Sequence, residues 1–136
     1  MNGYNMSDKG YDVLARILAE SGKLNGFYLE YGGTTCAGAV RDKRYFESLE
    51  HSPGQGYIRV PVTVAYAKGP VVHLSAMVTR DQIEEDVKDV RFTCLTVVSM
   101  GHTKNEDQII FTTDIDVSLG VTDNAYTTID ATMRIG

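Results

Sequence analysis

Four aspartates near the C-terminus come closest, by type and spacing, to a set of metal ligands. Asp114 and Asp116 are next-but-one neighbours, Asp123 follows in the next polar turn, and Asp130 lies in the last alternating segment. Ca²⁺ prefers clustered carboxylate oxygens, and the first two side chains would project from one face of a strand. However, the loop pattern of an EF-hand is absent, and aspartates on the solvated face of a strand need no ligand. We therefore expect no metal site, although the sequence alone leaves cation binding by Asp114, Asp116 and Asp123 undecided.

The residues that could support catalysis form no known motif. His51, His73 and His102 are far apart in the sequence and show neither H-x-H nor H-E-x-x-H spacing. No serine lies in a G-x-S-x-G elbow, and the glycines around residues 32–33 and 54–56 fit no phosphate-binding loop. We expect no catalytic residue, no cofactor-binding residue and no small-molecule substrate. An enzyme whose site combines distant residues such as His73 and Asp114 is the least favoured alternative.

The chain has two cysteines, which are too few for a disulfide scaffold and too isolated for a zinc motif. Cys94 lies in an apolar strand-like pattern, which predicts a buried thiol that packs as a small hydrophobic side chain. Cys36 lies in a loop rich in glycine and threonine. A bridge between the two is the less favoured alternative, because the sequence gives no sign of export to an oxidising compartment.

The charge of the chain argues against nucleic acid as a partner. The net charge is −5 and the sequence pI is about 5.1, whereas phosphate binding needs a basic face. Arg41, Lys43 and Arg44 form a basic cluster, but Asp42 and Glu47 interrupt it, so we expect a solvated helical face there. The N-terminus lacks the apolar segment of a signal peptide, and no apolar run is long enough for a membrane span. We expect synthesis in the cytoplasm and no membrane partner.

Alternation of side chains predicts a chain built mostly of β-strands. Residues 125–135 alternate between an apolar and a polar face, which is typical of a half-buried antiparallel strand. Similar patterns predict strands over residues 27–31, 57–67, 71–79, 90–100 and 108–119, with the apolar 90–100 at the centre of a sheet. Strands that follow one another without intervening helices pair antiparallel. The sequence thus predicts one domain over residues 1–136, mainly β, as an antiparallel β-sandwich or flattened barrel of about six strands with one N-terminal helix packed on it.

The helical segments have recognisable boundaries. Ser7 is a good N-cap for a helix over residues 8–20, and Gly22 suits the position after its end. The side chains that recur at helical spacing, and that we expect to pack on the sheet, are Tyr11, Leu14, Ile17 and Leu18. Residues 41–49 are expected to form a short helix. Residues 1–6 are expected to form a short flexible arm.

Two features point to contacts between subunits. The segment 57–67 is expected to lie at the edge of a sheet or to carry a bulge, because Pro61 cannot donate to a ladder. If it lies at an edge, its apolar side chains would aggregate unless a neighbour covers them. The chain also has eight tyrosines and no tryptophan. Tyrosine is enriched at protein interfaces, but it is also common on strands for packing reasons, so the sequence supports both interpretations equally.

Residues 10–31 combine a short helix, a turn and an aromatic strand. The turn is Leu24-Asn25-Gly26, and the strand Phe27-Tyr28-Leu29-Glu30-Tyr31 ends in an acidic and an aromatic residue. The segment Arg59-Val60-Pro61-Val62 follows a Ser-Pro-Gly loop, and the C-terminal strand is rich in threonine. In these features the chain resembles small structural proteins of tailed-bacteriophage virions, most closely over its first third. The resemblance implies a non-enzymatic virion component of the head-decoration, collar, tail or baseplate type.

Two functions are expected from these observations. The first is a non-enzymatic structural protein of a bacteriophage virion, made in the host cytoplasm, that contacts copies of itself and other virion proteins in a repeated assembly. The alternative is a small β-sandwich binding module for a carbohydrate or a peptide. Its contacts would come from loops at one end, namely residues 32–40, 51–56 and 101–107.

Overall fold

The computed structural model describes residues 6–33, 36, 41–83, 89–120 and 126–136. In chain order the described elements are α1 (Asp8–Glu20), β1 (Gly26–Tyr31), α2 (Lys43–Glu50), β2 (Gly56–Pro61), β3 (Val64–Lys68), β4 (Val71–Val78), β5 (Val90–Ser99), β6 (Gln108–Leu119) and β7 (Thr127–Arg134). Single 3₁₀ turns lie at Arg80–Gln82 and Lys104–Glu106. None of the described helices is long and apolar enough to cross a membrane. Most of the predicted arm 1–6 and the residue Ala125 lie outside the described residues.

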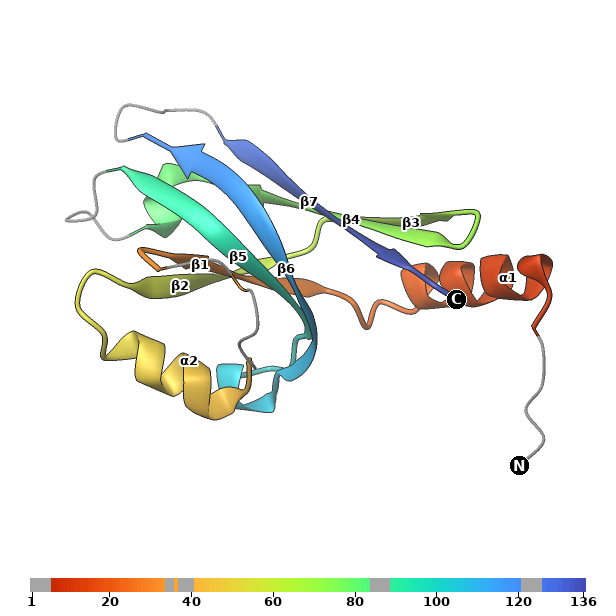
Figure 1. Ribbon diagram of the computed structural model, residues 1–136, viewed down its shortest axis with the longest axis horizontal. Helices are drawn as coiled ribbons and strands as arrows, with labels where there is room; N and C mark the ends of the chain where they lie inside the picture. Colours follow the sequence, from red (N-terminus) through yellow and green to blue (C-terminus); the bar gives the residue numbers. More distant parts are fainter. Residues whose placement is uncertain (1–5, 34–35, 37–40, 84–88, 121–125) are drawn as a thin grey trace.

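The described strands form two antiparallel sheets that face each other (Figure 1). The four-stranded sheet has the order β2-β1-β5-β6, and the three-stranded sheet has the order β3-β4-β7. Large, fully buried side chains from both sheets fill the space between them: Phe27, Leu29, Phe92 and Leu95 from the first sheet, and Leu74, Val78 and Ile129 from the second. The predicted mainly β sandwich is confirmed, and its sheets do not close into a barrel.

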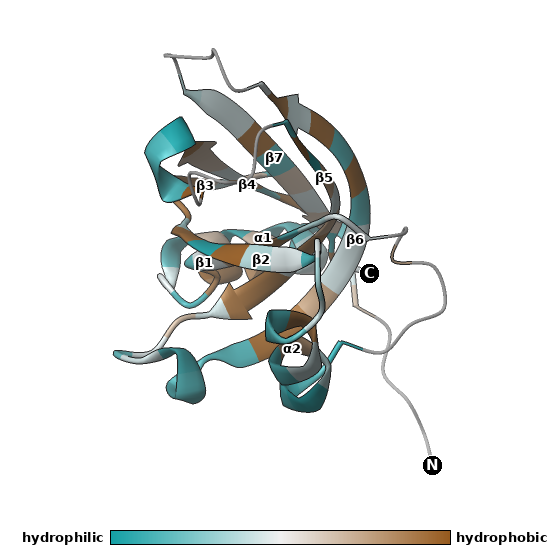
Figure 2. Cartoon of the chain, turned by 90° about the vertical axis from the view of Figure 1, so that its left-hand side faces the viewer, coloured by the Kyte–Doolittle hydropathy of each residue, from teal (hydrophilic) through white to brown (hydrophobic). Residues whose placement is uncertain are grey.

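Alternation of side chains places each strand as the sequence predicts. In β4 the inward residues Val72, Leu74, Ala76 and Val78 are all fully buried. In β6 and β7 polar residues take the opposite face, and Figure 2 shows apolar and polar segments alternating along the curved β6. The most apolar strand, β5, lies in the interior of the four-stranded sheet, between β1 and β6, as predicted.

The prediction of a single strand over residues 57–67 is wrong in one respect, because these residues form two strands in different sheets. β2 pairs with β1 as far as Pro61, and the Val62 amide then donates to the Asn25 carbonyl at 2.8 Å. The next amide, of Thr63, donates to the Ser75 carbonyl of β4 at 2.8 Å. The chain therefore crosses from one sheet to the other within two residues. Pro61 lies opposite Gly26 in a pair that is not hydrogen-bonded, so its nitrogen, which carries no hydrogen, faces away from β1 at the open edge of the sheet. This crossing makes seven described strands where the sequence predicts six.

The helix α1 has the predicted bounds but a different buried face. The Ser7 hydroxyl caps it by accepting from the Gly10 amide at 3.1 Å, and Gly22 follows it with a φ of 72°. α1 lies along the β3–β4 hairpin, beyond the end of the four-stranded sheet (Figure 1). Its fully buried side chains are Ala15 and Ala19.

The apolar stripe predicted to face the sheet is therefore only partly buried. Leu18 packs against the core, but Leu14 and Ile17 are 38% and 57% exposed. Alanine permits a close approach between the helix backbone and the sheet, so the alanine side of α1 is buried and larger apolar side chains remain outside.

Replacing Ala15 with leucine should lower the free energy of unfolding by about 1–3 kcal/mol, because an added side chain cannot fit between α1 and the sheet. Ala15 is fully buried, at 0% exposure. The matched control is Leu14→Ala, one residue away on the exposed side, which should change stability by less than about 0.5 kcal/mol. Urea unfolding of the two variants measures both values. The opposite ranking would mean that Leu14, and not Ala15, faces the sheet.

The helix α2 covers the outer face of the four-stranded sheet. The Asp42 carboxylate caps it by accepting from the Tyr45 amide at 2.8 Å. Phe46 and Leu49 from α2 pack with Tyr28 of β1 and Val98 of β5 as a second, smaller apolar cluster. Because of this cluster, β1 is buried on both faces, and polar groups on its outer side need partners.

Candidate functional site

Asp107 is the centre of a polar cluster on the outer face of the four-stranded sheet. Its carboxylate accepts hydrogen bonds from Nε and Nη2 of Arg59 at 2.7 Å each, from the Tyr28 hydroxyl at 2.5 Å and from the Gly101 amide at 2.8 Å. Its side chain is only 1% exposed. Burial alone would raise the pKa of this carboxyl, but the hydrogen bonds from Arg59, Tyr28 and Gly101 outweigh it and lower the pKa below its ordinary value.

The groups around Asp107 are held in fixed protonation states. Burial, together with the hydrogen bond to Asp107, raises the pKa of Tyr28 well above its ordinary value. Burial and the bond to Glu50 do the same for Tyr57. An ionised carboxylate with all its donors in place and two neutral phenols have no proton to exchange near neutral pH. The hydrogen bonds of the cluster connect β1, β2 and the turn before β6. Its groups thus hold these elements together.

The substitution Asp107→Asn should lower the free energy of unfolding by about 1.5–3 kcal/mol at pH 7, because charge-assisted hydrogen bonds are lost. The folded pKa of Asp107 is depressed. The stabilisation is thus complete above the unfolded pKa of about 3.9 and is lost as the pH falls through the folded pKa. The difference between wild type and variant should therefore shrink below about pH 4. Urea unfolding of both proteins at several pH values between acidic and neutral measures this difference in the free energy of unfolding.

The control for Asp107 is Asp116→Asn. Asp116 also pairs with an arginine, Arg91, at 2.8 Å, but the two side chains are 69% and 66% exposed. Solvent screens such a pair, so no measurable change in stability is expected. Equal effects of the two substitutions at pH 7 would show that burial does not strengthen the Asp107 cluster.

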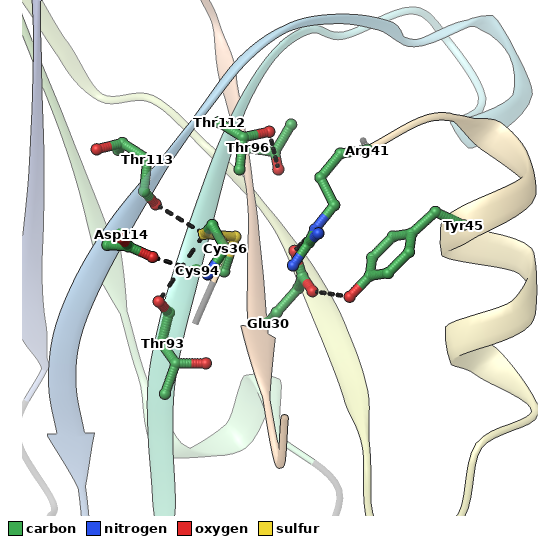
Figure 3. Close-up of a disulfide and its surroundings, with 10 residues drawn as sticks. All are labelled: Glu30, Cys36, Arg41, Tyr45, Thr93, Cys94, Thr96, Thr112, Thr113 and Asp114. Carbon is green, nitrogen blue, oxygen red and sulfur yellow. Dashed lines mark hydrogen bonds and ion pairs between the residues drawn. A yellow bond between two sulfur atoms is a disulfide. The ribbon is translucent and has the colours of Figure 1, made fainter. Parts of the chain in front are cut away.

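A second polar group lies on the same face, where Arg41 contacts Glu30 (Figure 3). Nε of Arg41 lies 2.9 Å from Oε2 of Glu30, and the two side chains are 3% and 5% exposed. The Tyr45 hydroxyl donates to the other carboxylate oxygen, and the guanidinium lies 4.1 Å from the centre of the Tyr45 ring. Burial and the hydrogen bond to Glu30 raise the pKa of Tyr45 to about 12.

The prediction of a solvated basic face is therefore wrong for Arg41. Its guanidinium is buried against Glu30, which occupies the doubly covered strand β1 and needs a cationic partner. Lys43 and Arg44 are exposed as predicted. Nζ of Lys43 also donates to the Asn105 carbonyl at 2.6 Å and so links α2 to the turn before β6.

Cys36 and Cys94 form a disulfide (Figure 3). The prediction of a free, buried Cys94 thiol is thus wrong, whereas its complete burial is confirmed. Residue 94 lies opposite Glu30 and Asp114 in the ladders of β5. The Cys36 amide donates to Asp114 at 2.7 Å, and this fixes the residue over the outer face of the sheet. The bridge and the Arg41–Glu30 pair therefore hold two points of the connection between β1 and α2.

The predicted metal candidates do not converge in the described part of the chain. Asp114 accepts from Cys36, Asp116 pairs with Arg91, and Asp130 on β7 accepts from the Ser75 hydroxyl. Asp123 lies outside the described residues. No group of three or more histidine, cysteine, aspartate or glutamate side chains in the described ranges could hold a metal ion.

The histidines are also separate. His73 lies on the outer face of the three-stranded sheet, where its ring stacks on Tyr66 at 4.8 Å with an angle of 7° between planes. Asp114 lies on the outer face of the other sheet, so the proposed pair of His73 and Asp114 is divided by the whole sandwich. His51 follows α2 and His102 precedes the Lys104–Glu106 turn, and both are exposed.

The cavities among the described residues are small or open. One of about 40 Å³ lies between α2 and the turn before β6, with Tyr28, Phe46, Tyr57 and Lys104 in its lining. Lys104 also pairs with Glu50, and this pair closes one side. A second, of about 380 Å³, lies beside the start of α1, with Asp8, Asp12 and Arg134 in its lining. The first has room for no more than a few water molecules.

The loops expected to form one contact set lie at different ends of the four-stranded sheet. Gly32 and Gly54 are in close contact, so residues 32–33 and 51–56 share the end where β1 stops and β2 begins. Residues 101–107 follow β5 at the opposite end, where Gly26 pairs with Val98. Residues 34–35 and 37–40 of the first loop lie outside the described residues.

The tyrosines divide into buried and exposed groups. Tyr28, Tyr45 and Tyr57 belong to the aromatic cluster around Phe46, with ring centres about 5 Å apart. Their role is therefore packing. Tyr66 and Tyr126, at 50% and 59% exposure, are the described tyrosines most accessible to a partner.

Exposed apolar side chains gather on α1 and β3. Val13, Leu14 and Ile17 are exposed on α1, and Val64 and Tyr66 are 49% and 50% exposed on β3. Tyr66 pairs with His73 on the outer face of the three-stranded sheet, whereas α1 packs on the inner side through Ala15. The two groups therefore lie on different faces of that sheet, and we call Val64 and Tyr66 the β3 surface. Contiguous exposed apolar residues mark contact sites on soluble proteins. The sequence indicates this surface through the edge strand, but it misplaces the apolar stripe of α1 in the core.

Comparison with known proteins gives no relative: no protein-family model, no curated protein and no solved structure matches the chain.

Proposed function

We propose that this chain is a non-enzymatic structural protein of a tailed-bacteriophage virion. It would be made in the host cytoplasm and would act by contacting copies of itself and other virion proteins, as a decoration, collar, tail or baseplate component. The observation that carries the proposal is the β3 surface, where the apolar side chains Val64 and Tyr66 of an edge strand are half-exposed. The class of particle comes from the resemblance of residues 10–31.

The polar side chains support a structural role. Asp107, Glu30 and Asp116, which could have served as acids, bases or ligands, each pair with an arginine. The tyrosines at the polar clusters are held neutral, as the raised pKa values of Tyr28 and Tyr45 indicate. The buried groups among them, around Asp107 and Glu30, fix the positions of strands and helices, which suits a component of a repeated assembly.

Mass spectrometry of purified particles tests this proposal. The chain is expected in intact virions in a fixed number of copies, and to remain after the washing that removes host proteins. Labelled antibody in electron microscopy would then show whether it lies on the head, collar, tail or baseplate. Absence from every particle fraction would overturn the proposal.

A further inference from the structure

The strand β3 has one free edge. Among the described strands it pairs only with β4, since the order of the three-stranded sheet is β3-β4-β7. Val64 and Tyr66 are half-exposed, and the sole charged residue of the strand is Lys68 at its end. A free edge presents backbone amides and carbonyls to any strand that can approach it.

The other sheet edges in the described part of the chain carry features that oppose pairing between copies. β6 bears Asp114 and Asp116, so two copies paired along it would bring carboxylates together. β7 bears Asp130 and Arg134. β2 ends in Pro61, which lacks an amide hydrogen, and α2 packs against it. β3 is the edge without such protection.

The backbone groups that β3 leaves free follow from its turn. Lys68 and Val71 flank the two-residue turn Gly69-Pro70, in which Gly69 has a φ of 57°. The pair that closes such a turn is hydrogen-bonded, and hydrogen-bonded pairs alternate along the ladder. The residues that bond to β4 are therefore 64, 66 and 68, and Ala65 and Ala67 direct their amides and carbonyls outward.

These outward groups match a second copy of the same edge. In an antiparallel pair centred on Tyr66, Ala65 of each copy lies opposite Ala67 of the other, so both outward residues find hydrogen-bonding partners. Tyr66 then faces its own counterpart across the two-fold axis, and such aromatic cross-strand pairs are favourable. Lys68 lies opposite Val64 of the other copy, so no like charges meet.

The charges of α1 also suit this arrangement. Tyr11, on one side of the helix, lies close to Gly136, just after β7. β3 lies at the opposite edge of that sheet. The opposite side of the helix, which carries Arg16 and Glu20, therefore faces the free edge of β3. A two-fold axis at β3 makes the two α1 helices antiparallel neighbours. Arg16 of each copy then approaches Glu20 of the other, which is an attractive pairing.

We propose that β3 binds a second copy of this chain through its free edge, with the two β3 strands pairing antiparallel about Tyr66 to form a continuous six-stranded sheet. The inference rests on the proposed function, in which the chain contacts copies of itself, and adds the strand, the register and the symmetry of the contact. A two-fold dimer of this type uses the same surface on both partners.

Tyr66→Lys tests the contact, with Tyr126→Lys as its matched control. Both replace an exposed tyrosine, at 50% and 59% exposure, by a lysine. Sedimentation velocity over a range of concentrations should show a wild-type dimer. Tyr66→Lys should raise its dissociation constant about tenfold or more, because two like charges then lie directly opposite, whereas Tyr126→Lys should leave it unchanged. Circular dichroism confirms that both variants fold.

Two further variants test the register. Ala65→Pro removes an outward amide while leaving the ladder to β4 intact, so it should weaken the dimer with little loss of fold. Tyr66→Cys should give a covalent dimer on mild oxidation, since the two native cysteines are already paired, and Tyr126→Cys should not.

Other results would overturn the inference. A wild-type chain that stays monomeric at all concentrations excludes the dimer, as does a dimer that Tyr66→Lys leaves intact. If the chain is monomeric and Tyr66→Lys abolishes its incorporation into particles, the edge binds a different virion protein. In that case the proposed function stands and the second copy is excluded. If the chain is absent from particles but forms a dimer that depends on Tyr66, the dimer stands and the proposed function is excluded.

Discussion

Removal of the disulfide, by Cys36→Ser together with Cys94→Ala, is expected to lower the free energy of unfolding by about 4 kcal/mol. The two cysteines are 58 residues apart, so the bridge closes a long loop and strongly restricts the unfolded chain. Alanine is chosen at position 94 because that side chain is fully buried and a hydroxyl there would need a partner. Guanidinium unfolding of the two proteins without reductant measures the difference.

Reduction provides the control for this prediction. A phosphine reductant should lower the unfolding midpoint of the wild type toward that of the variant and should leave the variant unchanged, since the variant has no bridge. An unchanged midpoint of the reduced wild type would contradict a stabilising role of the bridge.

Much of the fold could be predicted from the sequence because local patterns determine it. The alternation in β4, β6 and β7 sets which side chains face the core, and a shift of one residue would expose all of them. The bounds of α1 follow from Ser7 and Gly22, whose cap and positive φ act within a few residues. Such signals need no knowledge of the rest of the molecule.

The errors concern features that depend on distant residues. From the sequence, Arg41 is predicted to lie on a solvated helical face. Its burial follows from the burial of Glu30 beneath α2, because that carboxylate needs a cationic partner. The pairing of Cys36 with Cys94 requires the connection after β1 to cross β5, which spacing along the chain does not reveal. The stripe of α1 also depends on the sheet, since the close approach at Ala15 and Ala19 leaves Leu14 and Ile17 outside.

The interaction surface could be predicted only in outline. Pro61 indicates an edge strand, and β2 is the edge of the four-stranded sheet, but the edge without protection belongs to β3, on the far side of the crossing at Val62 and Thr63. Continuous alternation through the crossing hides it, because the sequence pattern persists while the chain changes sheets. Alternation alone puts Val64 and Tyr66 on the same face as Val60, which is fully buried, whereas they are half-exposed.

The buried ion pair gives a second large expected effect. Arg41→Met should lower the free energy of unfolding by about 3–5 kcal/mol, because it leaves the Glu30 carboxylate buried without its cation. The two side chains are only 3% and 5% exposed, so water cannot replace the lost partner without opening the connection between β1 and α2. Urea unfolding at pH 7 measures the loss.

Two comparisons separate this effect from a simple loss of packing. Arg44→Met makes the same change at an exposed position three residues further on and should cost less than about 0.5 kcal/mol. The double substitution Glu30→Leu with Arg41→Met removes both charges, and it should cost clearly less than the sum of the two single substitutions, since neither charge is then left unpaired. Additive losses, or an Arg41→Met variant as stable as Arg44→Met, would place Arg41 on a solvated face after all.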